Sequence, residues 1–336
     1  MLRVRSCFAR SAGAWIMARG MCSSTSASLY DRSYTDVASR DVSLWTVRCE
    51  PNSTSPATPS TSAAHTADAD VDDDATLPLL CLCGALGTAE TDFAPQLAGL
   101  SSRREVLSFD PRGYGRSRPP RRDYCAEDAA YPDGNYWERD ADDAAALMQS
   151  LGHDRYAVFG WSDGANSAAI LAAKHPTAVS RLVLLGGNAF VADEDIEAYE
   201  AVRDVSQWSV KMREALEAVY GGADAECGGL QAVWSQWFAA IERVYEDGGD
   251  VCTSRLQDVV CKTLVIHGAL DPMVPEFHAD YFHERISHAR LELIDDGKHN
   301  VHLRHPERVN AIIETFLCEP DDAATASREF VAIVKN

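Results

Sequence analysis

The 336-residue sequence lacks several features, and each absence excludes a class of protein. No apolar run reaches the length that a membrane-spanning helix needs. The sequence has no Walker-type phosphate loop and no paired Cys-x-x-Cys pattern, so we expect neither a metal nor a cofactor. Basic residues are few, 31 Lys and Arg against 51 Asp and Glu, and the net charge is −20. Such an acidic chain disfavours nucleic acid and anionic membranes as partners.

The ten cysteines are scattered along the chain and lack the regular spacing of a disulfide framework. Free, mostly buried thiols in a reducing compartment are typical of that distribution. The length suits one large α/β domain with insertions, which we place at residues 31–336.

Three segments differ in composition from the rest of the chain. Residues 1–30 contain arginines and serines but no acidic residue, which predicts a mitochondrial targeting segment, the alternative being a disordered basic tail. Residues 51–76 are rich in Ser, Thr, Ala, Pro and Asp without periodicity, so we expect a disordered insertion. Residues 319–336 are interpreted as a C-terminal tail. We therefore expect a mitochondrial location.

Strand patterns alternate with helical ones over most of the chain. This alternation predicts an α/β fold with a mostly parallel, doubly wound sheet. Residues 188–260 interrupt it with helical patterns and predict a helical lid over the active site. Aromatic residues in this segment favour a lid core over a ligand platform; they are Trp208, Trp234, Trp237 and Phe238. We also expect a short helix to begin at Phe93.

The sequence Gly-Trp-Ser-Asp-Gly at residues 160–164 carries the most specific chemical signal. A short apolar segment, 156–159, precedes it and predicts a buried strand, and an Ala-rich segment that ends at Pro176 predicts a helix after it. This is the G-x-S-x-G nucleophile elbow, in which a sharp strand-to-helix turn exposes the central serine. Ser162 is therefore the candidate nucleophile.

A serine hydroxyl needs a base to take its proton and an acid to orient that base. Asp271 lies just past an apolar strand that begins at Lys262 and breaks into a turn at Gly268. Residues 289–299 read as a second strand followed by a loop that carries His299. The order Ser, Asp, His is that of the α/β-hydrolases, and side chains at the carboxyl ends of parallel strands can converge. Asp193, Asp195, Asp295 and Asp296 remain alternative acids. Other histidines, such as His302 and His305, we expect on the surface.

Acyl transfer also needs N–H donors for the oxyanion that forms on the substrate. One donor in such sites is the backbone N–H after the nucleophile, here that of Asp163, and the other comes from the loop after the third strand. The strand and loop at 79–87 fit that description. We expect Ala85 to be the second donor, with Leu86 as the next candidate.

From Leu79 to Leu317 the chain resembles the valacyclovir hydrolases, also called biphenyl hydrolase-like proteins, a family within the α/β-hydrolase superfamily. The matching stretches lie on both sides of the elbow, which is itself among them; the others are 90–93, 109–115, 188–190, 193–195, 203–209 and 297–300. The chain departs from the pattern in three places. Ala165 replaces an expected glycine, the loop at 83–85 reads Cys-Gly-Ala, and the 51–76 insertion and the tail are extra.

The resemblance implies an α/β-hydrolase fold and a cofactor-independent serine esterase that cleaves esters of α-amino acids. It further implies that the carboxylate of Asp163 binds the substrate α-ammonium. An anion beside an oxyanion site opposes the charge that forms there, and a cationic substrate removes that penalty. The alternative is that Asp163 only complements the helix N-terminus. We expect a monomer with a small-molecule ester as its partner.

Two other functions fit the same residues. One is a carbon–carbon bond hydrolase of ring-cleavage products, which would share the fold and the three side chains but take anionic substrates. The other is a hydrolase fold that serves as a receptor or scaffold without turnover.

Overall fold

The computed structural model describes residues 30–51, 73–124, 135–222 and 228–320. The predicted targeting segment therefore lies outside the described residues except for Tyr30. The same holds for residues 52–72 of the predicted insertion and for residues 321–336 of the predicted tail. Asp73–Thr76, at the end of that insertion, form a 3₁₀ turn, η2, instead of continuing without structure.

One eight-stranded sheet runs through the described part of the molecule in the order β1-β2-β4-β3-β5-β6-β7-β8. Its strands are β1 Asp31–Val37, β2 Val42–Cys49, β3 Leu79–Leu82, β4 Val106–Phe109, β5 Tyr156–Trp161, β6 Val179–Leu185, β7 Lys262–Gly268 and β8 Ala289–Ile294. The pairs β1–β2 and β2–β4 are antiparallel, and all the others are parallel. The expected mostly parallel sheet is thus confirmed.

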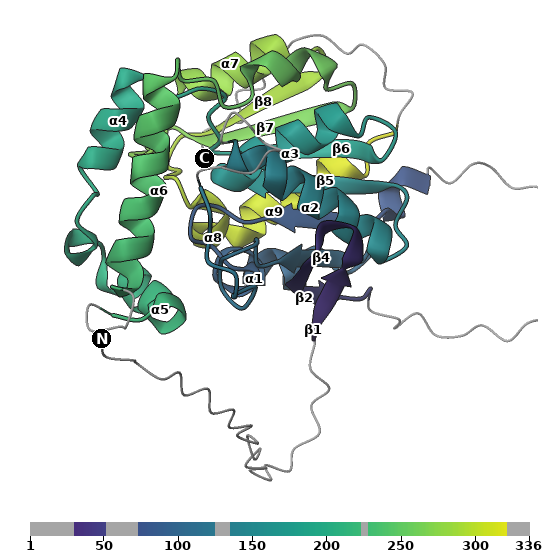
Figure 1. The fold of residues 1–336 in the computed structure, drawn as a ribbon. Helices are drawn as coiled ribbons and strands as arrows, with labels where there is room; N and C mark the ends of the chain where they lie inside the picture. The colour runs from purple at the N-terminus through teal and green to yellow at the C-terminus, as the bar shows by residue number, and fades with distance from the viewer. Residues whose placement is uncertain (1–29, 52–72, 125–134, 223–227, 321–336) are drawn as a thin grey trace, which may run out of the picture.

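Helices cover both faces of this sheet (Figure 1). One face packs against α1 Ala89–Gly99, α8 Val301–Arg304 and α9 Pro306–Leu317, and the other against α2 Tyr136–Ser150, α3 Asp163–Lys174 and α7 Phe277–Arg285. Successive residues of a strand point to opposite faces, which explains the continuous apolar runs of the central strands. Leu182 and Leu184 face the α3 side, for example, and Val183 and Leu185 face the α9 side.

The chain between β6 and β7 forms a separate group of helices at the carboxyl ends of the strands. It contains α4 Asp193–Glu200, η3 Val205–Gln207, α5 Val210–Tyr220, α6 Gly229–Glu246 and η4 Thr253–Asp258. Figure 1 shows α4, α5 and α6 standing beside the sheet. Their buried aromatic side chains join the core on the α3 side, so this helical group is anchored to the sheet domain by packing. We call it the helical insertion.

Helix α1 begins earlier than expected. It starts at Ala89 and not at Phe93, because Thr88 and Thr91 form a reciprocal capping box. The Thr88 side chain accepts from the Thr91 N–H at 3.1 Å, and the Thr91 hydroxyl accepts from the Thr88 N–H at 2.8 Å. A capping box usually has Glu or Gln at its fourth position, whereas here that position is Thr91, so the sequence does not show the usual signature of a helix start. The earlier start brings α1 close to the loop after β3.

Candidate active site

Ser162 lies between β5 and α3 in a strained backbone conformation. Its φ is 55° and its ψ is −126°, in the left-handed half of backbone space that non-glycine residues avoid. Neighbouring backbone leaves no room for a Cβ at Gly160 or Gly164: one built there would lie 2.2 Å from Gly164 O and 2.0 Å from Leu82 O, respectively. The glycines of the motif are therefore required by close packing, and the turn they permit places Ser162 at the N-terminus of α3.

The loops after β7 and β8 touch each other through two glycines. A Cβ built on Gly268 would lie 2.5 Å from the carbonyl carbon of Gly297, so only glycine allows this approach. The Ala269 N–H donates to Ile294 O at 3.0 Å and the Leu270 N–H donates to Gly297 O at 2.8 Å. Because the two loops are fastened together, the side chains that follow them are held at a fixed separation.

The structure brings the three predicted side chains into one hydrogen-bonded series. His299 Nε2 lies 3.0 Å from Ser162 Oγ, and His299 Nδ1 lies 2.8 Å from Asp271 Oδ2. A carboxylate only accepts, so Nδ1 carries the imidazole proton and Nε2 is left to accept from the serine hydroxyl. The Trp161 indole N–H donates to the His299 carbonyl at 2.9 Å and fixes its backbone. This geometry can deprotonate a serine as it attacks a carbonyl carbon.

The Asp271 side chain is buried, and both of its oxygens are hydrogen-bonded. Its Oδ1 accepts from the N–H groups of Met273 at 2.8 Å and Val274 at 3.1 Å, while Oδ2 faces His299. Burial alone would raise the pKa of this carboxyl, but the neighbouring imidazole and the Met273 N–H outweigh burial, and the pKa lies below its ordinary value. Asp271 is therefore ionised at neutral pH and can stabilise a positive charge on His299.

Two groups of N–H donors face the region of Ser162. At the start of α3, the backbone N–H groups of Asp163 and Gly164 have no acceptor among the described residues. The same is true of Ala85 in the loop after β3, whereas the Gly84 N–H donates to Asp92 Oδ2 at 3.0 Å and the Leu86 N–H bonds to the Tyr114 hydroxyl. Gly84 packs against the elbow, since a Cβ there would lie 3.2 Å from Ser162 Cβ. The start of α3 and the loop after β3, which carry these donors, therefore meet at Ser162.

Three aromatic side chains surround the Asp163 carboxylate. The Tyr136 hydroxyl donates to Oδ2 at 3.0 Å, the Trp137 indole to Oδ1 at 3.0 Å, and the Trp237 indole to Oδ2 at 2.7 Å. Burial raises the pKa of this carboxyl despite the three bonds. All three donors are neutral, so they satisfy the oxygens without cancelling the charge. Trp237, for which the sequence favours a place in the lid core, also joins α6 to the residue that follows the nucleophile.

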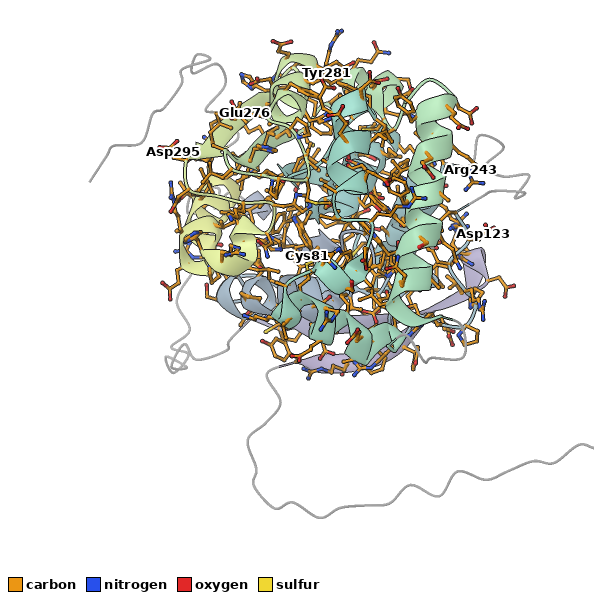
Figure 2. All side chains as sticks on the ribbon, turned by 90° about the vertical axis from the view of Figure 1, so that its left-hand side faces the viewer. Cys81, Asp123, Arg243, Glu276, Tyr281 and Asp295 are labelled. Atoms are coloured by element: carbon orange, nitrogen blue, oxygen red, sulfur yellow. The ribbon has the colours of Figure 1, made fainter. Side chains whose placement is uncertain are left out.

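The alternative acids lie elsewhere. Asp195 pairs with His278, its Oδ2 lying 2.9 Å from Nε2, with both side chains fully buried. The Asp193 carboxylate accepts from the Tyr245 hydroxyl, and Asp296 pairs with Arg308 at 3.1 Å. Asp295 is exposed at the edge of the molecule (Figure 2). Among these aspartates and Asp271, only Asp271 bonds to His299.

The expectation that His302 lies on the surface is wrong. Its side chain is fully buried, Nε2 bonds to the Asp92 carbonyl at 3.0 Å, and the ring packs 4.7 Å from that of Trp161. Burial lowers the pKa of this imidazole to about 3, so it is neutral at physiological pH. His302 supports the loop that carries His299, a function that the sequence pattern did not indicate.

The described residues contain no group of three or more His, Cys, Asp or Glu side chains placed to hold a metal ion. No described helix combines the length and the apolar character that crossing a bilayer requires.

Several known proteins are similar to this chain in sequence. Residues 79–312 match the model of the alpha/beta hydrolase family. Over 241 residues the chain is 42% identical to the protein "Serine hydrolase BPHL" of Homo sapiens, covering 71% of this chain and 78% of that protein. The Mus musculus protein of the same name matches equally well. A 2-hydroxymuconate semialdehyde hydrolase from Pseudomonas sp. (strain CF600) is 26% identical over 268 residues, covering 75% of this chain and 91% of that protein.

Solved structures share the fold at low sequence identity. A 2-hydroxy-6-oxo-6-phenylhexa-2,4-dienoate hydrolase from Rhodococcus sp. strain RHA1 superposes with a TM-score of 0.62 at 14% identity, over 85% of this chain and 98% of that one. A proline iminopeptidase from Mycobacterium smegmatis superposes with a TM-score of 0.58 at 22% identity, over 88% and 100%. At these identities the likeness concerns the architecture alone.

Proposed function

The chain belongs to the alpha/beta hydrolase family, and from that premise we propose that it is a serine esterase that cleaves esters of α-amino acids. Hydrolase chemistry follows from the similarity to the human and mouse serine hydrolases. The ester bond and the α-amino group of the substrate are our proposal. Resemblance to the valacyclovir hydrolases supports both.

The observation that carries the proposal is the uncompensated charge of Asp163. Its carboxylate directly follows the nucleophile in the chain and is buried, and each described residue that donates to it is neutral. Arg122, which acts on this carboxylate through its charge, is itself paired with Asp140 at 2.5 Å. Three acceptor positions are used, and one lone pair of Oδ1 is left. A substrate α-ammonium bonded there would neutralise the carboxylate at the moment an oxyanion forms nearby.

In the proposed reaction, His299 takes the proton of Ser162 as the serine oxygen attacks the ester carbonyl. The N–H groups of Asp163 and Ala85 donate to the oxyanion, and Asp271 stabilises the imidazolium. His299 then protonates the departing alcohol, leaving an acyl-enzyme. Water attacks this ester while His299 accepts its proton, and the free amino acid leaves with Ser162 restored.

A carbon–carbon bond hydrolase is the second candidate, because one relative is a 2-hydroxymuconate semialdehyde hydrolase. Ring-cleavage products of that type carry carboxylates. A carboxylate bound beside Asp163 would repel it in a site of low polarity, where charge repulsion is strong. This repulsion favours the amino-acid ester over the anionic substrate.

The test is to replace Asp163 with asparagine and compare two esters that differ only in the α-ammonium. L-Phenylalanine benzyl ester and 3-phenylpropionic acid benzyl ester form such a pair. For the amino ester we expect kcat/KM to fall about 100-fold, because a charge-assisted bond of about 3 kcal/mol is lost. For the des-amino ester we expect a change of less than about threefold. The measurement is steady-state kinetics on both substrates.

Two controls accompany this comparison. Asp193→Asn removes an equal charge from the helical insertion, where the carboxylate bonds to Tyr245, and we expect neither ester to be affected. Ser162→Ala shows the background without the proposed nucleophile. Equal losses on both esters in Asp163→Asn would mean that Asp163 serves the elbow and does not recognise the substrate.

A further inference from the structure

The loop after β3 holds a strained residue next to the nucleophile. Residues 84–87 form a tight turn in which the Gly87 N–H donates to Gly84 O at 3.0 Å. Leu86 occupies this turn with a φ of 61°, in the left-handed region that a leucine avoids. The Ala85 N–H, which has no acceptor among the described residues, belongs to the same turn. Its direction therefore depends on keeping Leu86 in its unfavourable conformation.

From the sheet domain, a carboxylate holds one end of this turn. Asp92 Oδ2 accepts from the Gly84 N–H at 3.0 Å and fills the concave side of the loop, where a Cβ on Gly87 would lie 1.8 Å from the same oxygen. This contact fixes Gly84. It does not touch the peptide between Leu86 and Gly87, whose carbonyl faces the helical insertion.

A tyrosine of the helical insertion holds the other end. The hydroxyl of Tyr220, the last residue of α5, donates to Leu86 O at 2.8 Å and accepts from the Gly115 N–H at 3.3 Å. The ring is buried between Arg118, whose guanidinium lies 4.7 Å from the ring centroid, and Tyr114, which meets it edge-on at 6.3 Å. These ring contacts and the two hydrogen bonds hold the hydroxyl in position.

We propose that Tyr220 is a positioning residue that couples the helical insertion to the oxyanion hole. Its hydroxyl holds the Leu86 carbonyl, and thereby directs the Ala85 N–H toward the substrate oxygen. When the insertion moves away, Leu86 is free to leave its strained conformation and this donor turns aside. The hole is complete only while the insertion is seated, which confines acyl transfer to the closed, water-poor state. This inference rests on the proposed ester chemistry.

Removing the hydroxyl alone leaves the insertion in place, because other contacts anchor it. The Trp237 indole N–H donates to Asp163 Oδ2 at 2.7 Å, and Asp195 on α4 pairs with His278 on α7 at 2.9 Å. The ring of Tyr220 keeps its contacts with Arg118 and Tyr114 when it becomes phenylalanine. The Tyr220→Phe variant therefore tests the hydroxyl and not the presence of the lid.

For Tyr220→Phe we expect kcat to fall about tenfold with KM changed less than about twofold, because loosening a donor costs less than the 10²–10³-fold of losing one. The rate at which a fluorophosphonate labels Ser162 is expected to fall by the same factor, since its anionic oxygen uses the same donors. Tyr245→Phe is the matched control. Its hydroxyl bonds to Asp193 within the helical insertion, and we expect wild-type rates.

The experiment separates this inference from the proposed substrate. Both L-phenylalanine benzyl ester and its des-amino analogue are measured, and Tyr220→Phe should slow them equally. If wild type shows no preference for the amino ester while Tyr220→Phe still slows both, the substrate proposal fails and the coupling stands. A variant with unchanged kcat and labelling rate, or with a raised KM alone, would show that the hydroxyl only helps to hold the helical insertion on the sheet. That result would overturn the inference. Melting temperatures within about 3 °C of wild type exclude unfolding as the cause.

Discussion

Asp271 and Asp92 are both buried carboxylates within the candidate site, yet their surroundings differ. Asp271, after β7, faces an imidazole, and the attraction of His299 holds its pKa below the ordinary value although burial acts to raise it. Asp92, on α1, faces the Gly84 N–H and the Thr91 hydroxyl. Burial dominates there and raises the pKa to about 7. Asp271 has a titratable cation beside it, whereas Asp92 has neutral donors and the like charge of Asp110, and these surroundings account for the difference.

The difference matches what each side of the site has to do. Positive charge forms on His299 in the proposed reaction, so a permanently ionised Asp271 stabilises it. Negative charge forms at the oxyanion, so a full charge on Asp92 behind the Gly84 loop would oppose it. A carboxyl with a pKa of about 7 is half neutral at neutral pH, which weakens that opposition. The neighbouring Asp110 follows the same rule, since burial raises its pKa to about 6.

The largest effect is expected on the histidine side. Asp271→Asn replaces the acceptor at His299 Nδ1 with a group that can donate, so the imidazole is no longer held in the tautomer that accepts from Ser162. We expect kcat to fall about 10⁴-fold at pH 7. The measurement is kcat for a benzyl ester, with Asp92→Asn as the matched variant on the opposite side. A comparable loss in Asp92→Asn would break the distinction between the two carboxylates.

The sequence predicted those parts of the site that follow from local motifs and from the alignment of parallel strands. Ser162, Asp271 and His299 were placed correctly in space because each lies in a local strand-end motif and parallel strands align their carboxyl ends. Trp237 and Tyr220 were not linked to the site. They lie in the helical insertion. Its position on the sheet depends on tertiary packing, which no local sequence pattern predicts.

The role of Asp92 was also out of reach of the sequence. Asp92 lies in the stretch 90–93 that resembles the family. Its buried position beneath the Gly84 loop follows only because α1 begins at Ala89. His302 was misplaced for a related reason. It occupies the short helix α8, which packs on α1, so the polar loop pattern around His299 suggested exposure where the fold provides burial.

The second effect concerns stability, and its sign follows from the raised pKa of Asp92. A group whose pKa is about 7 when folded and 3.8 when unfolded stabilises the fold fully below 3.8, and that contribution disappears as pH rises through 7. Because a pKa difference of one corresponds to about 1.4 kcal/mol, the contribution is on the order of 4 kcal/mol. Asp92→Asn, which cannot ionise, should flatten the decline in unfolding free energy between pH 4 and pH 7.

Urea denaturation at several pH values across this window measures the slope. Asp271→Asn supplies the opposite sign, because a lowered pKa contributes stability above 3.8 that is lost as pH falls. An Asp92→Asn slope equal to that of wild type would mean that the carboxyl ionises as freely in the folded protein as in the unfolded chain, and the contrast between the two carboxylates would disappear.

The smallest effect is expected for a residue that stabilises helix α1, next to the loop after β3, without touching the reacting groups. Thr88→Ala removes the side-chain acceptor of the Thr91 N–H at the start of α1 and breaks the capping box. We expect the free energy of unfolding to fall by about 1 kcal/mol, as for other N-cap threonines. The value of kcat should stay within about twofold, because Asp92 still reaches Gly84 from the next turn of the helix. Urea denaturation and steady-state kinetics on the same preparation test both parts. A tenfold loss of kcat would show that the cap itself orients the loop after β3, and that Asp92 alone does not hold it.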